Sequence, residues 1–324
     1  MPSLSITNHE ICPCLVITGP TATGKTALAV ALAHALNSEI FSVDSRQVYR
    51  GLDLGTGKDL LEYRNFSPPI PYHLIDVVEP SDVYSLYRFQ KECYSQLENF
   101  RQRKPEHIPP ILVGGTDLYL EAILKRYAIA QIPENPMVRR ELEARELADL
   151  QNELRRVNPS LFESTDILNK RRVVRALEIT LLKDKGSPRE DLPLWILKPL
   201  VFVMKWDRPS LRQRIAKRLD QRLQEGLVDE VRQLQAKGLS WERLEDLGME
   251  YREIATHLRG AKDFSTMRSD LLQAIQHLAK RQDTWFRGME RRGIKTIPIG
   301  PETKLKNVME IYHLWKQQGY RDPD

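Results

Sequence analysis

The sequence predicts an α/β fold in which a doubly wound parallel sheet is interrupted by a helical insertion. Over about the first 125 residues, short apolar segments typical of buried strands alternate with longer helical segments. A highly charged segment follows, at about residues 127–196, with helical patterns and no convincing buried strand. An apolar strand at Val201–Met204 then returns the chain to the sheet. We therefore expect two core parts, residues 1–126 and 197–324, around a helical insertion domain at 127–196.

The first half follows this alternation element by element. Leu15–Ile17 is typical of a buried strand, and Thr26–Leu36 is rich in Ala and Leu, which favours a helix. The elements expected next are a short strand at Glu39–Val43, a strand at Tyr72–Val77, a helix over about Ser85–Arg101, a strand at Ile111–Val113 and a helix from about Leu118.

The second half is mostly helical in pattern. In the insertion, Val173, Val174, Leu177 and Leu181 recur at helical spacing, and a loop-like segment follows at residues 185–189. The elements expected after the returning strand are an amphipathic helix with Leu211, Ile215, Leu219 and Leu223 on one stripe, helices around Glu250 and over Met267–Met289, a strand at Ile294–Ile297 that Pro298 would end, and a helix over about Leu305–Gln317.

A glycine motif lies between the first strand and the first helix. The glycines let backbone N–H groups converge on an anion, and the helix N-terminus adds positive potential. Lys25 would contact a terminal phosphate, and the Thr26 hydroxyl would bind Mg2+. A plain helix-capping turn is the alternative, but the strand–helix context favours a P-loop NTPase-like site for a di- or triphosphate. The residues that fill the pattern G-x-x-x-x-G-K-[ST] are Gly19, Pro20, Thr21, Ala22, Thr23, Gly24, Lys25 and Thr26.

Two aspartates follow strands of the predicted sheet. In open α/β sheets ligands bind at the carboxyl ends of the strands, so Asp44 is a candidate general base or a ligand that holds a metal through water. A helix cap or a turn-stabilising carboxylate is its alternative role. Asp76 also follows a strand and could instead hold the Mg2+ ion, through water, together with Thr26.

The composition is ordinary for a globular protein, with 41% hydrophobic and 29% charged residues among 324. Lys and Arg exceed Asp and Glu by 49 to 44, and this formal charge of +5 is too mild to identify a nucleic-acid binder. Cys12, Cys14 and Cys93 form no disulfide or zinc framework, which suits a reducing compartment. Neither a secretory signal nor an apolar stretch of membrane-spanning length is visible. We expect a soluble, cytoplasmic protein.

Basic residues recur on predicted helices at spacings that place them on one face. Arg guanidinium groups suit phosphate oxygens, so these faces could bind a diphosphate or an RNA backbone, although solvated helix faces commonly look the same. Aromatic residues nearby are of the kind that stack on unpaired bases, but they are more often core. The residues concerned are Arg171, Arg172 and Arg175, Arg214 and Arg218, Lys280, Thr284 and Arg287, and the aromatic residues Tyr251 and Trp285.

Nearly from end to end, the sequence is similar to one family, the tRNA dimethylallyltransferases or tRNA isopentenyltransferases. The glycine motif is shared by many families, whereas the blocks at Asp44–Gly51 and Lys280–Arg287 are far more specific. The matching segments are Gly19–Thr26, Ser42–Gly51 with Asp53, Gly55 and Thr56, His73–Asp76, Val113–Thr116 with Leu118 and Tyr119, Arg172–Glu178, Gly226–Val231, Tyr251–Glu253, Lys280–Gln282 and Thr284–Arg287.

The resemblance implies a tRNA-modifying prenyltransferase. Family members transfer a dimethylallyl group from dimethylallyl diphosphate to the N6 amine of the adenosine 3′ of the anticodon, position 37. The tRNAs modified are those that read codons beginning with U; diphosphate leaves and Mg2+ assists. The motif, ATP-binding by its pattern, would hold the prenyl diphosphate together with Arg218, and Asp44 would accept the proton of the amine. The partners implied are tRNA and the prenyl diphosphate, and the expected state is a monomer.

The resemblance also implies an extended contact with tRNA, in which the helical insertion grips the anticodon arm. The residues implied in this contact are Asp44, Ser45, Arg46, Gln47, Thr116, Arg139, Arg171, Arg172, Val173, Val174, Arg175, Leu247, Gly248, Met249, Glu250, Tyr251, Arg252, Lys280, Arg281, Gln282, Asp283, Thr284, Trp285, Phe286 and Arg287.

The sequence departs from the family pattern at a few positions. Asp117 and Asp283 stand where Gly or an apolar residue is commoner, and Asp283 could weaken RNA binding slightly. Gly248–Glu250 departs from the commoner Gly directly before Tyr251. The zinc finger of eukaryotic relatives does not appear, which favours a bacterial-type enzyme. The alternatives are a kinase or NTPase that uses ATP, an RNA-binding module without catalysis, and an enzyme that prenylates free adenine nucleotides.

Overall fold

The computed structural model describes residues 10–105, 107–127, 129, 135–182 and 192–321. The chain divides into two compact units, one formed by Met1–Arg126 with Pro193–Asp324 and the other by Tyr127–Leu192. The predicted loop at 185–189 lies outside the described residues. Within the described ranges, no helix has the length and apolar character needed to span a membrane.

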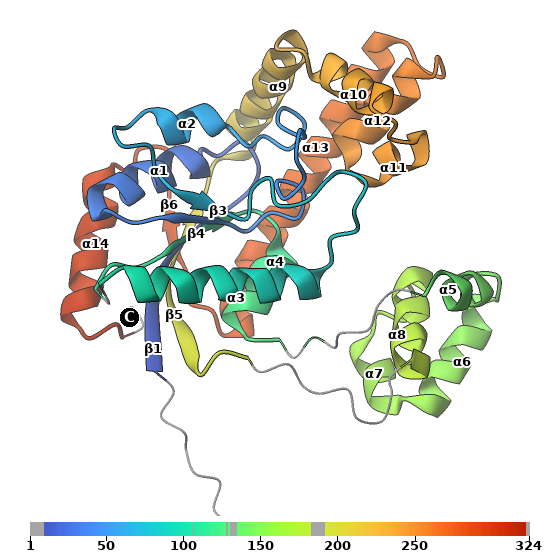
Figure 1. Ribbon diagram of the computed structural model, residues 1–324, viewed down its shortest axis with the longest axis horizontal. Coiled ribbons are helices and arrows are strands. Elements are labelled where there is room, and N and C mark those ends of the chain that lie inside the picture. The colour runs from blue at the N-terminus through green and yellow to red at the C-terminus, as the bar shows by residue number, and fades with distance from the viewer. Residues whose placement is uncertain (1–9, 106, 128, 130–134, 183–191, 322–324) are drawn as a thin grey trace, which may run out of the picture. The chain divides into compact units, whose positions relative to one another are not determined.

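The larger unit is built on a six-stranded sheet with the order β3-β2-β4-β1-β5-β6, in which all neighbours are parallel (Figure 1). From β1 the sheet extends in both directions, so the predicted doubly wound parallel sheet is confirmed. The strands are β1 (Glu10–Thr18), β2 (Ile40–Ser42), β3 (Tyr72–His73), β4 (Ile111–Gly114), β5 (Trp195–Met204) and β6 (Ile297–Ile299).

Helices connect these strands, and most of them begin and end near their predicted bounds. The helices α2, α10 and α11 and the short 3-10 helix η1 are not among the predicted ones. The helices of the larger unit are α1 (Lys25–Leu36), α2 (Leu60–Arg64), α3 (Leu86–Arg103), α4 (Asp117–Leu124), α9 (Arg208–Gln224), α10 (Leu227–Ala236), α11 (Trp241–Asp246), α12 (Met249–Leu258), α13 (Phe264–Arg287), the short 3-10 helix η1 (Glu290–Arg292) and α14 (Leu305–Gln317).

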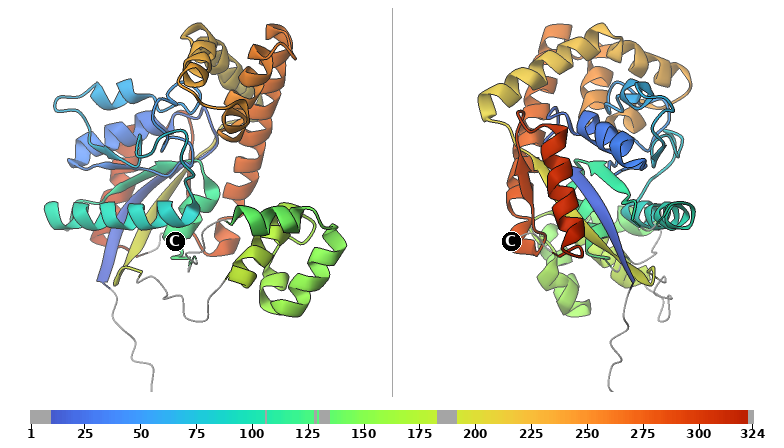
Figure 2. Two further views of the ribbon diagram at one scale, coloured as in Figure 1. Left: turned by 45° about the vertical axis from the view of Figure 1, so that its right-hand side comes forward. Right: turned by 90° about the vertical axis from the view of Figure 1, so that its left-hand side faces the viewer.

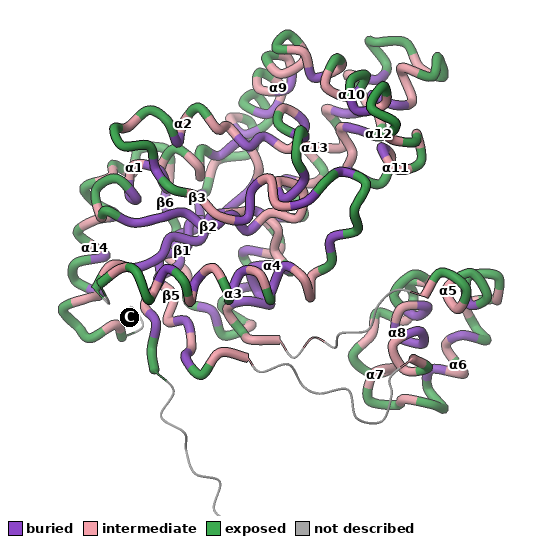
Figure 3. Tube along the Cα trace, viewed as in Figure 1, coloured by how far each residue is buried: buried purple, intermediate pink, exposed green. Residues whose placement is uncertain are grey.

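Helices pack on both faces of the sheet. Leu15 and Ile17 of β1 belong to one core cluster with Trp315 of α14 and apolar residues of α1. On the other face, the Phe41 ring of β2 meets the Phe100 ring of α3 edge-on, with 5.7 Å between centroids. Figure 2 shows the sheet between α3 and α14, and Figure 3 shows that the strands are the most buried part of this unit. The alternation of side chains along each strand therefore supplies two cores.

Four strands differ clearly from their predicted bounds, since β1 already begins at Glu10 and β6 is Ile297–Ile299. β3 ends at His73, because Leu74 and Asp76 have φ angles of 65° and 55°, a left-handed conformation that a strand does not contain. β5 begins at Trp195 rather than at Val201, since the segment before Val201 pairs with the first part of β1, from Glu10 onward. The sequence pattern misses this part because it carries polar and proline residues.

Prolines occur inside three strands, contrary to the expectation that Pro298 would end the last one. In β1, Pro13 pairs with β5 alone, because pairing with β4 begins only at Leu15. In β5, Pro199 pairs with β1 alone, because pairing with β6 begins at Phe202. Pro298 lies in β6, which is an edge strand. Each proline thus has a strand on one side only, where its missing N–H breaks no ladder.

The smaller unit is a bundle of short helices with its own core. Leu142, Leu150, Leu154, Val173 and Leu177 are buried together. The end of the predicted apolar stripe, Leu181, is instead 51% exposed. The helices of this unit are α5 (Pro136–Glu143), α6 (Leu147–Val157), α7 (Pro159–Ser164) and α8 (Lys170–Leu182).

A buried carboxylate joins three elements at the β3 side of the sheet. Glu39 directly precedes β2 and is 3% exposed. Its two oxygens accept hydrogen bonds from the guanidinium of Arg103, each at 3.0 Å, and Oε2 lies 2.7 Å from Nε2 of His73 in β3. Burial opposes ionisation, but the hydrogen bonds from Arg103 and His73 outweigh it and lower the pKa of Glu39 from 4.5.

Replacing Glu39 with Gln should lower the free energy of unfolding by about 1–3 kcal/mol near neutral pH, because charged hydrogen bonds are lost. A carboxyl whose pKa is lowered on folding stabilises the protein above its unfolded pKa, and this contribution is lost as the pH falls through the folded pKa. The difference between wild type and Glu39→Gln in urea unfolding should therefore shrink below about pH 4.5. A difference that stays constant down to pH 3 would contradict this explanation.

Candidate active site

A cavity of about 890 Å³ is lined by the segments that follow β1, β2 and β4. In an open parallel sheet this carboxyl edge is where ligands bind. Residues from α9, α12 and α13 complete the lining. The predicted site residues that line it are Thr21–Thr26, Asp44–Gln47, Thr116, Arg218, Leu247–Arg252, Arg281 and Gln282.

The loop between β1 and α1 has the conformation of an anion-binding turn. Gly24, with φ 90°, directly precedes α1, and no side chain caps this helix N-terminus. Ala22 also has a positive φ, 62°. The first turn of α1 contains no acidic residue. The open N–H groups and the helix dipole therefore favour a bound anion.

Three carbonyl oxygens of this loop, those of Pro20, Ala22 and Thr23, already have donors within the protein. Because they are engaged, the groups left to a ligand in the cavity are mainly N–H donors and cations. The bonds are Thr23 Oγ1 (2.8 Å) and Lys25 Nζ (2.7 Å) to the carbonyl of Pro20, Arg214 Nε (2.9 Å) to that of Ala22, and Trp206 Nε1 (3.2 Å) to that of Thr23.

The cations of the cavity lack sufficient counter-charge. Burial of its ammonium group, reinforced by nearby Arg218, lowers the pKa of Lys25 to about 8, although Asp44 and Asp59 oppose the shift. Burial, and next the neighbouring Arg222, lower the pKa of Arg218 from its usual value. Because opposite charge favours the charged form of both groups, a polyanion bound here would stabilise them.

Asp44 lies directly beyond β2 and holds a turn. Its Oδ1 accepts hydrogen bonds from the backbone N–H groups of Arg46 at 2.8 Å and Gln47 at 3.3 Å. This is the turn-stabilising role predicted as the alternative to catalysis. Both bonds go to Oδ1, and within the described chain Oδ2 has no hydrogen-bond partner. One carboxylate can therefore fix the turn and still offer an oxygen to a ligand.

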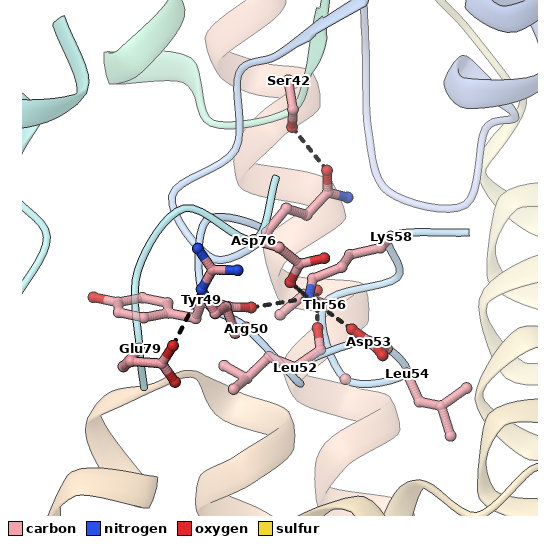
Figure 4. A network of polar contacts seen from close by, with 12 residues as sticks. Ser42, Tyr49, Arg50, Leu52, Asp53, Leu54, Thr56, Lys58, Asp76 and Glu79 are labelled. Carbon is pink, nitrogen blue, oxygen red and sulfur yellow. Dashed lines mark hydrogen bonds and ion pairs between the residues drawn. The ribbon is translucent and has the colours of Figure 1, made fainter. Parts of the chain in front are cut away.

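A buried lysine anchors the loop that follows Asp44 (Figure 4). Lys58 is 1% exposed and donates to Asp53 Oδ1 at 2.6 Å, Asp76 Oδ1 at 2.5 Å and the Tyr49 carbonyl at 2.9 Å. Asp76 is thus a counter-ion of Lys58 and does not line the cavity. The structure gives no support to its predicted role as a metal ligand.

The same loop is also held by a carboxylate of α10. The carboxylate of Glu230 accepts hydrogen bonds from the N–H groups of Asp53 at 2.9 Å, Leu54 at 2.7 Å and Gly55 at 3.1 Å. It also accepts one from the Tyr251 hydroxyl at 2.8 Å. A Cβ at Gly55 would lie 2.4 Å from that hydroxyl oxygen, so only glycine fits. Tyr251 is therefore a packing residue here.

Two polar side chains that were predicted to contact tRNA join the loops around the cavity. Gln282 of α13 accepts a hydrogen bond from Thr21 N at 2.9 Å and donates one to the Gly115 carbonyl at 2.8 Å. Thr116 Oγ1 accepts from Ser45 N at 3.1 Å. The glycine loop, the segment after β2 and the segment after β4 are thus fixed to one another.

Several other predicted tRNA contacts are buried, because their apolar side chains belong to the cores. Their burial argues against direct contact with RNA by these side chains. A lone sequence motif cannot separate such packing residues from surface residues on the same helix. The residues are Val173 and Val174 in α8, Leu247 and Tyr251 beside and within α12, and Phe286 in α13, each at most 3% exposed.

In the smaller unit, the predicted cations differ in how they are held. Arg139 and Arg175 both donate to the buried carboxylate of Glu178, at 2.8 Å and 2.7 Å. Burial opposes ionisation of Glu178, but hydrogen bonds, first that from Arg175, lower its pKa. Arg171 and Arg172 are exposed, and Arg172 pairs with Asp166.

The C-terminal half of α13 presents the remaining predicted cations. Asp283 pairs with Arg287 at 3.2 Å, so this departure from the family pattern partly neutralises a predicted RNA contact. The guanidinium group of Arg292 lies over the half-buried Trp285 ring, with its Cζ atom 4.3 Å from the ring centroid. The exposed residues among the predicted contacts of α12 and α13 are Arg252, Lys280, Arg281, Thr284 and Arg287.

Two residues of the glycine motif lie outside the main cavity. Gly19 has φ 141°, and a Cβ there would meet the Met204 carbonyl at 2.8 Å. Pro20 lines a second cavity of about 320 Å³, together with Lys280 and Asp283. These positions shape the loop rather than face the space where Lys25 lies.

Sequence reasoning missed several charged residues of the main cavity and one polar residue, Gln221. Arg222 follows Arg218 at the same four-residue spacing that joins Arg214 to Arg218, so continuing the helix periodicity would have found it. Asp59 and Glu62 follow no motif and reach the cavity only through the fold. The cavity residues concerned are Asp59, Glu62, Lys217, Gln221, Arg222 and Glu225.

The described residues fit a magnesium ion only as a partner of bound phosphate. They contain no group of three or more His, Cys, Asp and Glu side chains suited to a metal ion. Thr26, however, lines the cavity beside Lys25 at the N-terminus of α1. Mg2+ commonly binds one or two protein oxygens, water and substrate phosphates, and a single hydroxyl here suffices for that mode.

Comparisons of the sequence with known proteins agree with this geometry. A family described as IPP transferase matches residues 47–289, and one described as isopentenyl transferase matches residues 13–63. The chain is 47% identical over 309 residues to tRNA dimethylallyltransferase 1 of Geotalea uraniireducens, covering 94% of this chain and 98% of that protein. It is also 47% identical over 285 residues to tRNA dimethylallyltransferase 1 of Syntrophus aciditrophicus, covering 88% and 92%.

Solved structures give the same result. The tRNA isopentenylpyrophosphate transferase of Bacillus halodurans is similar with a TM-score of 0.66 and 32% identity, covering 95% of this chain and 96% of that one. A eukaryotic dimethylallyltransferase acting on tRNA, at 24% identity, shares the fold with a TM-score of 0.77 over 94% of this chain and 80% of that one. The chain therefore belongs to the IPP transferase family, that of the tRNA dimethylallyltransferases.

Proposed function

We propose that this protein transfers a dimethylallyl group from dimethylallyl diphosphate to tRNA, on the N6 amine of the adenosine at position 37 in tRNAs that read codons beginning with U. The observation that carries the proposal is that one cavity is lined both by an anion-binding loop with Lys25 and by the carboxylate of Asp44. The 47% identity to tRNA dimethylallyltransferases over most of the chain supports it.

The donor side of the cavity suits an allylic diphosphate. When the bond between the allylic C1 and the diphosphate oxygen breaks, its electron pair stays on the diphosphate. The added charge would be stabilised by groups that line the cavity, here the N–H groups of α1, Lys25 and Arg218. Because these groups are partly shielded from water, their effect on the leaving group is larger than in solution.

The acceptor side requires a base. The lone pair of an exocyclic adenine amine is delocalised into the ring, so the amine is a poor nucleophile. As its nitrogen bonds to C1, the amine must lose a proton, and Oδ2 of Asp44, a residue that lines the cavity, would accept it. Such proton transfer by a positioned base is worth about 10²- to 10⁴-fold in rate.

Thr26 and the diphosphate oxygens would hold a Mg2+ ion, without Asp76. When bound, the ion would neutralise charge that develops on the leaving group. Because the protein would supply a single hydroxyl, the donor diphosphate would have to supply most of the other ligands of the ion.

For the tRNA, we infer that the exposed cations of α12 and α13 contact the backbone near the cavity mouth. Lys280, Arg281 and Arg287 are exposed, and Arg281 also lines the cavity. The helical unit at 127–192 would bind the anticodon arm, with Arg171 and Arg172 as its exposed predicted cations. A target base would be flipped out of its stack to reach Asp44. The cytoplasmic location and the monomeric state stay predictions.

The activity can be measured directly. The purified protein, incubated with Mg2+, labelled dimethylallyl diphosphate and unmodified tRNA, should place the label on tRNA with adenosine at position 37. A tRNA with guanosine at that position is the matched control. It should stay unlabelled, because guanine carries a carbonyl oxygen at C6 where adenine carries the amine. Label that appears only in added AMP, or ATP hydrolysis without transfer, would overturn the proposal in favour of a nucleotide prenyltransferase or an NTPase.

The substitution Asp44→Asn should lower kcat by about 10²- to 10⁴-fold, while the Kd for tRNA changes less than about threefold. The asparagine side chain keeps an oxygen that can accept the hydrogen bonds from Arg46 and Gln47, so the turn should persist. Single-turnover rates and filter binding on the same samples separate the two effects. Wild-type turnover in this variant would show that the carboxylate serves only to hold the turn.

The double substitution Lys280→Ala and Arg281→Ala should weaken tRNA binding by about tenfold at low salt and flatten its salt dependence, because fewer phosphates are neutralised. Filter binding at several salt concentrations measures both. The matched control is Lys306→Ala, an exposed lysine of α14 that lines neither cavity. Equal salt slopes in the wild type and the double variant would show that these side chains are only solvated.

A further inference from the structure

Helix α9 carries a second guanidinium into the main cavity, one turn beyond Arg218. Arg222 lines the cavity, and its side chain is only 14% exposed. Its Nη2 is buried and has no hydrogen-bond partner in the part of the chain that the structure describes. The nearest carboxylate oxygen, Oδ1 of Asp59, lies 3.5 Å from it, which is an ion pair without a hydrogen bond. A buried cation in this state costs free energy unless an anion completes its contacts.

Asp59 is shared between the two guanidinium groups. Its Oδ2 pairs with Nη2 of Arg218, while its Oδ1 faces Nη2 of Arg222. The backbone of Asp59 has a positive φ of 50°, and its side chain makes no capping bond to α2. The neighbouring residue Lys58 is buried and fixed by three hydrogen bonds. The carboxylate is therefore presented to the arginines by a rigid segment.

The path of the backbone allows both arginines to approach. A Cβ at Gly57 would lie 1.8 Å from Nη2 of Arg222 and 2.9 Å from Nη2 of Arg218. Gly57 also has a positive φ of 62°. Any other residue at this position would displace the guanidinium groups from the space beside Asp59.

The local charge is unbalanced in favour of an added anion. Mutual repulsion of the two arginines adds to burial in lowering the pKa of Arg218. One carboxylate, Asp59, cannot saturate two guanidinium groups, each of which has five N–H donors. Glu62 also lines the cavity, but burial and then the charge of Asp59 raise its pKa, which weakens it as a counter-ion.

We propose that Arg222 is a second guanidinium ligand of the donor's diphosphate, and that Asp59 occupies the position of a phosphate group until the donor displaces it. The identity of the ligand rests on the proposed function. A diphosphate offers more oxygens and more charge than one carboxylate, so it can accept hydrogen bonds from both guanidinium groups at once. After transfer, Asp59 can return to the arginines and so assist the release of diphosphate.

The probe for the test is inorganic pyrophosphate with Mg2+, titrated calorimetrically into the full-length protein. Replacing Arg222 with Met, which keeps the length and removes the charge, should raise the Kd about 10- to 100-fold. Replacing it with Lys should give an intermediate Kd, because the ammonium group keeps the positive charge but lacks the paired N–H donors of the guanidinium group. The matched control is Arg212→Met on the same helix, which lines only the second cavity and should bind as the wild type does.

The proposed role of Asp59 predicts that its replacement strengthens pyrophosphate binding, whereas replacement of Arg222 weakens it. Asp59→Asn removes the competing charge and keeps the shape, so pyrophosphate should bind about 3- to 10-fold more tightly. A variant that lost a merely structural ion pair would bind no better than the wild type. Thermal unfolding without ligand checks that each variant is folded, and Arg222→Lys serves if Arg222→Met is not.

The outcomes separate this inference from the proposed function. Wild-type affinity for pyrophosphate in Arg222→Met or in folded Arg222→Lys would overturn the role of Arg222. Equal or weaker binding by Asp59→Asn would overturn the displacement. If the wild-type protein binds pyrophosphate with the expected changes in the variants but does not prenylate tRNA, the proposed function fails while the assignment of Arg222 stands.

Discussion

The candidate active site depends on a turn of backbone in which three carbonyl oxygens, those of Pro20, Ala22 and Thr23, already accept hydrogen bonds within the protein. Donors from Thr23, Lys25, Arg214 and Trp206 hold the carbonyls of the loop between β1 and α1. Without these contacts, carbonyl dipoles could turn toward the cavity and repel an anion. With them, the uncapped start of α1 and the Lys25 ammonium form a site that attracts one.

The carboxylate proposed as the base, that of Asp44, is positioned by segments distant in sequence. The loop after β2 carries Asp44, and its continuation is fixed by Lys58 from within and by Glu230 from α10. Gln282 of α13 joins the glycine loop to the segment after β4. These contacts explain why residues of the second half of the chain belong to the family pattern although several of them are buried and not available to RNA.

Charge in the cavity is divided between two tasks. On one side, Lys25, Arg218 and Arg222 lack enough counter-charge, which suits a leaving group that becomes more negative during the reaction. On the other, one oxygen of Asp44 has no hydrogen-bond partner among the described residues and, in the proposed reaction, would accept the proton of the amine. The two sets can share one cavity because the bound diphosphate, rather than Asp44, would neutralise the cations.

The sequence by itself determined the parallel α/β sheet, the glycine loop and the position of Asp44, because apolar periodicity and motif spacing are local properties of the chain. It could not place β6 across Pro298 or end β3 at His73, since strand pairing and left-handed backbone are set by neighbours. Only the tertiary structure decided which predicted contacts are buried, as Tyr251 is, and that Asp76 pairs with Lys58. It alone brought Asp59 between Arg218 and Arg222, because that meeting joins residues about 160 positions apart, beyond the reach of any local pattern.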